Sequence, residues 1–128
     1  MNLLLDTHVL LWAAADAPRL GEDARDLISD ENNALWFSAA SIWEVAIKTG
    51  LGRPDFAVDP QLLRRGLLEN GYNELSISAR HAAGVTHLPA IHRDPFDRLL
   101  VAQATDEGLL LLTADDEVAF YPGPIRKV

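Results

Sequence analysis

The sequence contains no cysteine, which excludes disulfide bonds, thiolate nucleophiles and sulfur ligands for a metal. Any metal ion must therefore bind through oxygen or imidazole. Long apolar runs are also missing, since stretches such as Leu109–Leu112 are far too short to cross a membrane. Residues 1–5 lack the basic segment and apolar stretch of a signal peptide, and Asp6 would interrupt one. We therefore expect a cytoplasmic protein.

Basic residues are scarce as well. The 11 Lys and Arg residues stand against 19 Asp and Glu residues, so the formal net charge is −8. This sign argues against a simple DNA-binding module, which neutralises phosphates with positive charge. It does not exclude a nuclease, because carboxylates that gather divalent cations present positive charge to a phosphate.

The chain length and composition predict one globular domain over residues 1–128. A length of 128 residues is near the common domain size, and the 48% hydrophobic content is typical of a packed core. The sequence shows no internal repeat, low-complexity tract or linker. We therefore expect a single compact unit.

Short apolar runs alternate with segments of helical character. The expected strands are Asn2–Leu5, Ala34–Phe37, Leu75–Ile77 and Leu109–Thr113. The expected helices are His8–Ala15, Glu22–Asp30, a segment from Ser38 to Gly50, Gln61–Leu68, Ser78–His87 and a segment from Asp94 to Gly108. This alternation predicts an α/β fold, an α/β/α sandwich around a central, mostly parallel sheet of four to five strands.

Four acids fall where such a sheet binds ligands, beyond the carboxyl ends of its strands. Asp6 follows the first strand, Glu44 lies in the helix after the second, Asp97 opens the helix before the fourth, and Asp115 follows the fourth. Each has an ordinary alternative role. Asp6 and Asp115 can cap helices, Glu44 can be solvated, and Asp97 can join a capping arrangement with Asp94.

The joint pattern favours a metal site. Carboxylates packed together repel one another unless a cation lies among them, and oxygen ligands without sulfur favour Mg²⁺ or Mn²⁺ over Zn²⁺. Asp116 is an alternative to Asp115 as the fourth acid, and Asp94 is either a supporting group or only a cap. A zinc site is not expected, because the histidines show no ligand spacing: His8, His81, His87 and His92.

Four segments resemble the motifs of PIN-domain ribonucleases, in order and over essentially the whole chain. They are Leu4-Leu5-Asp6-Thr7, Ser41-Ile42-Trp43-Glu44, Asp97-Arg98-Leu99-Leu100-Val101-Ala102 and Leu112-Thr113-Ala114-Asp115. The chain is also similar to the VapC toxins of bacterial toxin-antitoxin systems, and residues 92–98 (HRDPFDR) resemble one subgroup of them.

The resemblance implies a magnesium-dependent endoribonuclease that works with Mg²⁺ or Mn²⁺. Asp6, Glu44, Asp97 and Asp115 would be its catalytic and metal-ligating residues, and the hydroxyls of Thr7 and Thr113 would support them. It further implies a cognate antitoxin protein as partner and a homodimer. No residue indicates which RNA is cut or how many ions bind.

Other functions remain open at this stage. The chain could be a stand-alone PIN nuclease in RNA processing. A magnesium-dependent phosphohydrolase or phosphoacceptor domain would use Asp6 as nucleophile, although the paired acids usual after the first strand are missing. A non-catalytic interaction module would use the acids only as caps and surface charge.

Overall fold

One parallel sheet of five strands organises the computed structural model, which describes residues 1–128. The strand order is β3-β2-β1-β4-β5, and every neighbouring pair is parallel. The strands are β1 (Asn2–Leu5), β2 (Ala34–Ser38), β3 (Asn73–Leu75), β4 (Leu110–Thr113) and β5 (Ile125–Lys127). The predicted α/β class and parallel sheet are confirmed.

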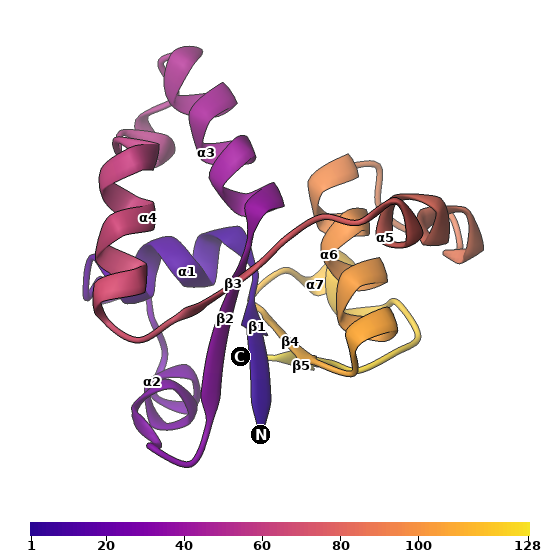
Figure 1. The fold of residues 1–128 in the computed structure, drawn as a ribbon, viewed down its shortest axis with the longest axis horizontal. Helices are drawn as coiled ribbons and strands as arrows, with labels where there is room; N and C mark the ends of the chain where they lie inside the picture. The colour runs from indigo at the N-terminus through magenta and orange to yellow at the C-terminus, as the bar shows by residue number, and fades with distance from the viewer.

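Helices cover both faces of the sheet (Figure 1). On one side lie α1 (Thr7–Ala14), α2 (Glu22–Ser29), α3 (Ala39–Gly50) and α4 (Pro60–Glu69), coloured indigo to magenta. On the other lie α5 (Ala79–Gly84), α6 (Pro95–Glu107) and α7 (Asp116–Ala119), coloured red-brown to yellow. Two short 3-10 turns complete the chain, η1 (Pro54–Phe56) and η2 (Val85–His87). None of these helices is long and apolar enough to cross a membrane.

The sheet separates two apolar cores. In β1, Leu3 and Leu5 pack into the core beneath α1 to α4, whereas Leu4 packs into the core beneath α6 and α7. In β4, Leu112 and Leu111 divide in the same way. Because side chains alternate along a strand, a strand covered on both faces needs an apolar residue at every position. This explains the unbroken leucine runs of both central strands.

Three strands run directly into a helix through a capping residue. The capping residue is Asp6 after β1, Ser38 at the end of β2 and Asp115 after β4. The side chain of each accepts a hydrogen bond from the main chain of the next helix. Such short connections place the starts of α1, α3 and α7 at the carboxyl edge of the sheet. The polar groups on these turns therefore share one edge.

Two edge strands differ from expectation. The third strand is Asn73–Leu75 rather than Leu75–Ile77, because Leu75 already pairs with Ser38, the last residue of β2. Residues beyond Leu75 therefore have no strand to pair with, and Ile77 is exposed. The strand β5 has no apolar run that would mark it in the sequence, since Arg126 and Lys127 are exposed at the sheet edge.

Gly108 ends α6 in the left-handed conformation, with φ of 67°. Replacing Gly108 by alanine is expected to lower the free energy of unfolding by about 1 kcal/mol, because a Cβ disfavours this φ. In Gly66→Ala, at a helical position of α4 with open space around it, the same methyl group is expected to raise it by about 0.5 to 1 kcal/mol. Urea denaturation of both variants measures the two signs, and equal effects would contradict this interpretation.

Candidate active site

Asp6 is buried where β1 meets α1, with only 4% of its surface exposed. Its Oδ1 accepts a hydrogen bond from the main-chain N–H of Val9 at 2.9 Å, so it caps α1 as expected. Its Oδ2 accepts a hydrogen bond from the hydroxyl of Thr113 at 2.5 Å, which joins the ends of β1 and β4. Burial raises the pKa of Asp6, and the hydrogen bond from Thr113 opposes that rise.

Glu44 points inward from α3 and is 2% exposed, so its alternative as a solvated surface residue is wrong. Its Oε1 accepts a hydrogen bond from the Thr7 hydroxyl at 2.6 Å, and Thr7 also lies 2.9 Å from the Ser41 hydroxyl. Its Oε2 lies 2.5 Å from Nζ of Lys48, one helical turn further along. A buried carboxylate with such partners is held in one orientation.

Asp97 is the acid whose surroundings show that the carboxylates converge. Its side chain, in the first turn of α6, is 16% exposed. Burial raises the pKa of Asp97 to about 8, and repulsion from four carboxylates adds to this rise: Asp94, Asp6, Glu44 and Asp115. The acids drawn from distant parts of the sequence are therefore near neighbours in space.

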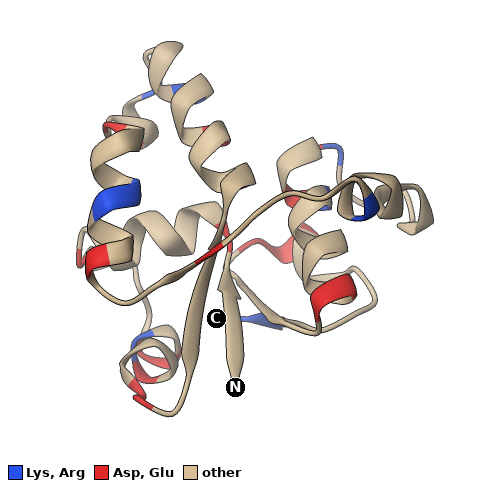
Figure 2. Ribbon diagram, viewed as in Figure 1, with Lys and Arg blue, Asp and Glu red and all other residues tan.

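Asp115 and Asp116, which the sequence left as alternatives, point in different directions. Asp115 caps α7 through Oδ1, which accepts a hydrogen bond from Glu117 N at 2.8 Å, and its Oδ2 turns to the acid cluster. Asp116 pairs with Lys127 on β5, and its side chain is 75% exposed. The structure thus brings Asp6, Glu44, Asp97 and Asp115 together and leaves Asp116 outside. In Figure 2 red segments on α7 and near the start of α6 lie beside the ends of the central strands.

Comparison with known proteins agrees with this arrangement. The model of the PIN domain family matches residues 3–122. The chain is 31% identical to Ribonuclease VapC22 of Mycobacterium tuberculosis over 124 residues. This aligned region covers 96% of this chain and 94% of that protein. This chain belongs to the PIN-domain family. The resemblance drawn from the four sequence motifs is confirmed.

Solved structures show the same PIN-domain fold. VapBC2 of Rickettsia felis, crystallised with a DNA fragment from its promoter, matches with a TM-score of 0.73 and 16% identity, over 100% of this chain and 99% of that chain. VapC20 of Mycobacterium tuberculosis, a toxin that cleaves the sarcin-ricin loop, matches with a TM-score of 0.62 and 16% identity, over 91% and 92%. At such identities the likeness concerns the fold alone.

The donors of this PIN domain suit a divalent cation. The pKa of about 8 for Asp97 reflects negative charge crowded into a buried space, and a cation among the acids would relieve it. The groups at hand are carboxylate oxygens and one imidazole, with no sulfur, which fits Mg²⁺ or Mn²⁺. These residues can therefore hold a metal ion.

Two positive side chains near the acids play different roles. Lys48 lies 2.5 Å from Glu44 and 3.9 Å from Oδ2 of Asp94, so it partly neutralises the PIN-domain acids. Asp94 caps α6, because its Oδ1 accepts a hydrogen bond from Phe96 N at 2.8 Å. Arg98 turns away and donates to the main-chain oxygens of Pro89 and Val85. Of these two residues, only Lys48 pairs with carboxylates of this region.

His92 was not identified from the sequence as part of the site. Its Nε2 lies 3.1 Å from Oδ2 of Asp97 and 3.5 Å from Oδ2 of Asp115. The Tyr121 hydroxyl fixes its main chain, accepting from His92 N at 2.8 Å and donating to His92 O at 3.2 Å. A loop histidine has no periodicity to mark it. Its one signal was its place in the HRDPFDR segment, directly before two of the acids.

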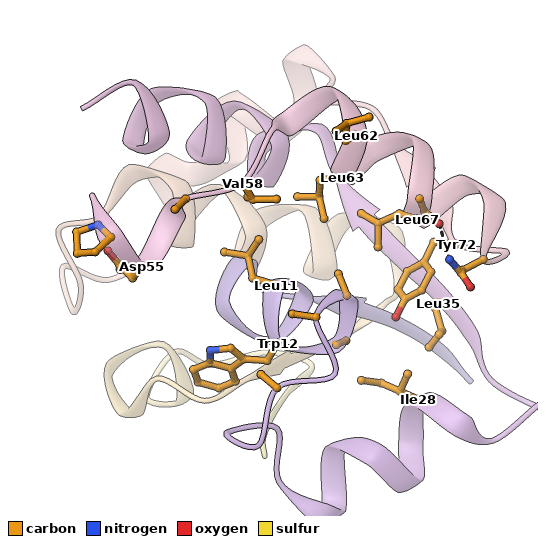
Figure 3. Close-up of a pocket in the computed structure, with 18 residues that line it drawn as sticks. Leu11, Trp12, Ile28, Leu35, Asp55, Val58, Leu62, Leu63, Leu67 and Tyr72 are labelled. Carbon is orange, nitrogen blue, oxygen red and sulfur yellow. Dashed lines mark hydrogen bonds between the residues drawn. The ribbon is translucent and has the colours of Figure 1, made fainter. Parts of the chain in front are cut away.

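A large apolar pocket of about 810 Å³ lies on the side of α1 and α4, and none of the four clustered acids lines it (Figure 3). Leu11 and Trp12 of α1 face Leu63 and Leu67 of α4 across it. Of its 18 lining residues, 14 are hydrophobic. Such an apolar hollow suits a protein partner better than a phosphodiester.

Proposed function

We propose that this chain is a metal-dependent endoribonuclease that hydrolyses RNA phosphodiester bonds. The observation that carries the proposal is the cluster of Asp6, Glu44, Asp97 and Asp115 at one edge of the sheet, with the pKa of Asp97 raised to about 8. Membership of the PIN-domain family supports it, as does the 31% identity to a protein named a ribonuclease.

In this proposal the four acids bind Mg²⁺ or Mn²⁺. A bound ion would activate water and stabilise negative charge on the leaving oxygen. Thr113 and Thr7 orient the carboxylates of Asp6 and Glu44 through hydrogen bonds of 2.5 Å and 2.6 Å. Lys48 lies close enough to the acids to contact a phosphate of the substrate. Lys48 on α3 would thus bind the RNA backbone, and the backbone would be cut between α3 and α6.

The geometry gives no support to the other candidate functions. A phosphoacceptor site usually carries paired acids after the first strand, whereas Thr7 and His8 follow Asp6 in this chain. A non-catalytic module would have its acids at the surface, whereas Asp6 and Glu44 are buried. The ribonuclease therefore remains the proposal that uses all four acids.

We further propose that the chain is the toxin of a toxin-antitoxin pair, with a small cognate antitoxin protein as partner. Its structural neighbours include VapBC2 of Rickettsia felis and DNA-bound VapBC of Salmonella typhimurium. The apolar pocket beside α1 and α4 supports a protein partner. The homodimer and the cytoplasmic location stay predictions, as does the single domain over residues 1–128.

Incubation with total cellular RNA tests the proposed activity. With Mg²⁺ or Mn²⁺ the protein is expected to cut RNA at discrete positions, which sequencing of the new ends would map. EDTA is expected to abolish these cuts and excess Mg²⁺ to restore them, because the acids alone repel phosphate. Identical cutting in EDTA would contradict the metal requirement, and an absence of cuts under every condition would contradict the ribonuclease itself.

A further inference from the structure

We propose that the imidazole of His92 is a nitrogen ligand of the cation held by the acids, and that Glu117 is the carboxylate that orients this imidazole. This inference rests on the proposed metal site and adds two residues to it. The geometry, the fixed position of the ring and the partners of its two nitrogens each support it.

The distances fit ligands that share one ion. Two donors at right angles around an ion, each about 2.1 Å from it, lie about 3 Å apart. Nε2 of His92 lies 3.1 Å from Oδ2 of Asp97 and 3.5 Å from Oδ2 of Asp115. The ligand atoms of these three residues all lie within 4.8 Å of one another. A single cation can therefore contact all three with small movements.

The main chain that carries the His92 ring is held in place by contacts that leave Nε2 free. Tyr121, which is 3% exposed, bonds both the N–H and the C=O of His92 through its hydroxyl. Arg98 donates to the same hydroxyl at 3.1 Å. The His92 side chain is 18% exposed, and three carboxylates lie within 3.5 Å of its ring nitrogens: Asp97, Asp115 and Glu117. A fixed ligand of this kind binds metal with little loss of conformational freedom.

Each nitrogen of the ring has a partner in either tautomer. Nδ1 accepts a hydrogen bond from Asp94 N at 3.2 Å, so the proton resides on Nε2 and faces Asp97. When a cation binds Nε2, that proton must move to Nδ1, where Oε2 of Glu117 at 3.4 Å can accept its hydrogen bond. A carboxylate then fixes the tautomer of the metal-bound ring, as is common for metal-binding histidines.

A second cluster shows what an arrangement unsuited to metal looks like. His81 lies 2.8 Å from Oε1 of Glu107 and 3.4 Å from Oδ2 of Asp106 through Nε2. Its Nδ1, however, accepts from Ser78 N at 3.0 Å and faces the Gln103 amide at 3.4 Å, with no carboxylate on that side. No carboxylate on that side can accept a hydrogen bond from Nδ1, as a metal-bound Nε2 would require. His92 differs by having Glu117.

Pulsed electron paramagnetic resonance of the full chain loaded with Mn²⁺ tests the assignment. Wild type is expected to show a directly bound imidazole nitrogen, whose ¹⁴N coupling changes to ¹⁵N when histidine alone is ¹⁵N-labelled. His92→Gln is expected to lose this coupling, and His87→Gln, at an exposed position of η2, to keep it. Glu117→Gln is expected to keep the coupling but weaken Mn²⁺ binding about tenfold in calorimetry.

The outcomes separate this inference from the proposed function. Stoichiometric Mn²⁺ binding without a histidine nitrogen coupling would overturn the role of His92 and leave the carboxylate site standing. No stoichiometric binding at all would overturn the metal site as well. Coupling that persists in His92→Gln would assign it to another histidine. Circular dichroism checks the fold of each variant. If a variant does not fold, the wild type with ¹⁵N-labelled histidine still shows whether a histidine binds the ion.

Discussion

Replacing Asp97 by asparagine is expected to reduce RNA cleavage at least about a thousandfold, because it removes the central carboxylate of the proposed metal site. Asparagine has nearly the same shape, and the side chain of Asp97 does not cap α6, which Asp94 does. The fold should therefore survive. Initial rates of cleavage of a labelled RNA at saturating Mg²⁺, with circular dichroism as the check on folding, measure the effect.

Asp115 and Asp116 offer a matched control for this experiment. Asp115→Asn keeps a capping side chain at the start of α7 but removes a charge from the cluster, so cleavage should fall at least about a hundredfold. Asp116→Asn removes the same charge from an exposed side chain paired with Lys127, so cleavage should change less than about twofold. Equal losses in the two variants would contradict the assignment of the fourth acid.

The sequence allowed the positions of Asp6 and Asp115 to be predicted because apolar strands and helix caps have local sequence signatures. Asp6 and Asp115 each follow an unbroken leucine run, and parallel strands align their carboxyl ends at one edge. Of the two roles weighed for Asp6 and Asp115, the helix cap is confirmed. Asp6 uses Oδ1 for the cap and turns Oδ2 toward Thr113. The cap uses one oxygen of the carboxylate, and the role of Asp6 as a metal ligand stays a prediction.

What the sequence did not reveal depends on tertiary packing. The burial of Glu44 follows from the way α3 packs against α1, where Thr7 meets it. The place of His92 follows from the Tyr121 hydroxyl, which holds the loop from 29 residues away. Neither contact has a local signature. The polar edge strand β5 was not predicted for a related reason, since it lacks the alternation or the apolar run by which strands are recognised in a sequence.

The raised pKa of Asp97 makes a further prediction, which concerns stability. In the metal-free protein Asp97 keeps its proton up to about pH 8, whereas in the unfolded chain it loses the proton near its ordinary value of 3.8. The folded state therefore binds more protons between these values. Stability contributed by the neutral carboxyl is fully present below pH 3.8 and is lost as pH rises toward 8. The free energy of unfolding should fall by about 1.4 kcal/mol for each pH unit in this window.

Denaturation in EDTA at a series of pH values, for wild type and Asp97→Asn, isolates this contribution as a difference between the two proteins. The difference should grow in favour of the variant as pH rises, because asparagine has no proton to lose. With saturating Mg²⁺ this fall should disappear in wild type, since the ion competes with that proton and binds about tenfold more tightly per pH unit gained, which offsets the loss. Parallel pH curves for the two proteins in EDTA would show that Asp97 ionises freely, and the crowded acid cluster would then lose its chief physical support.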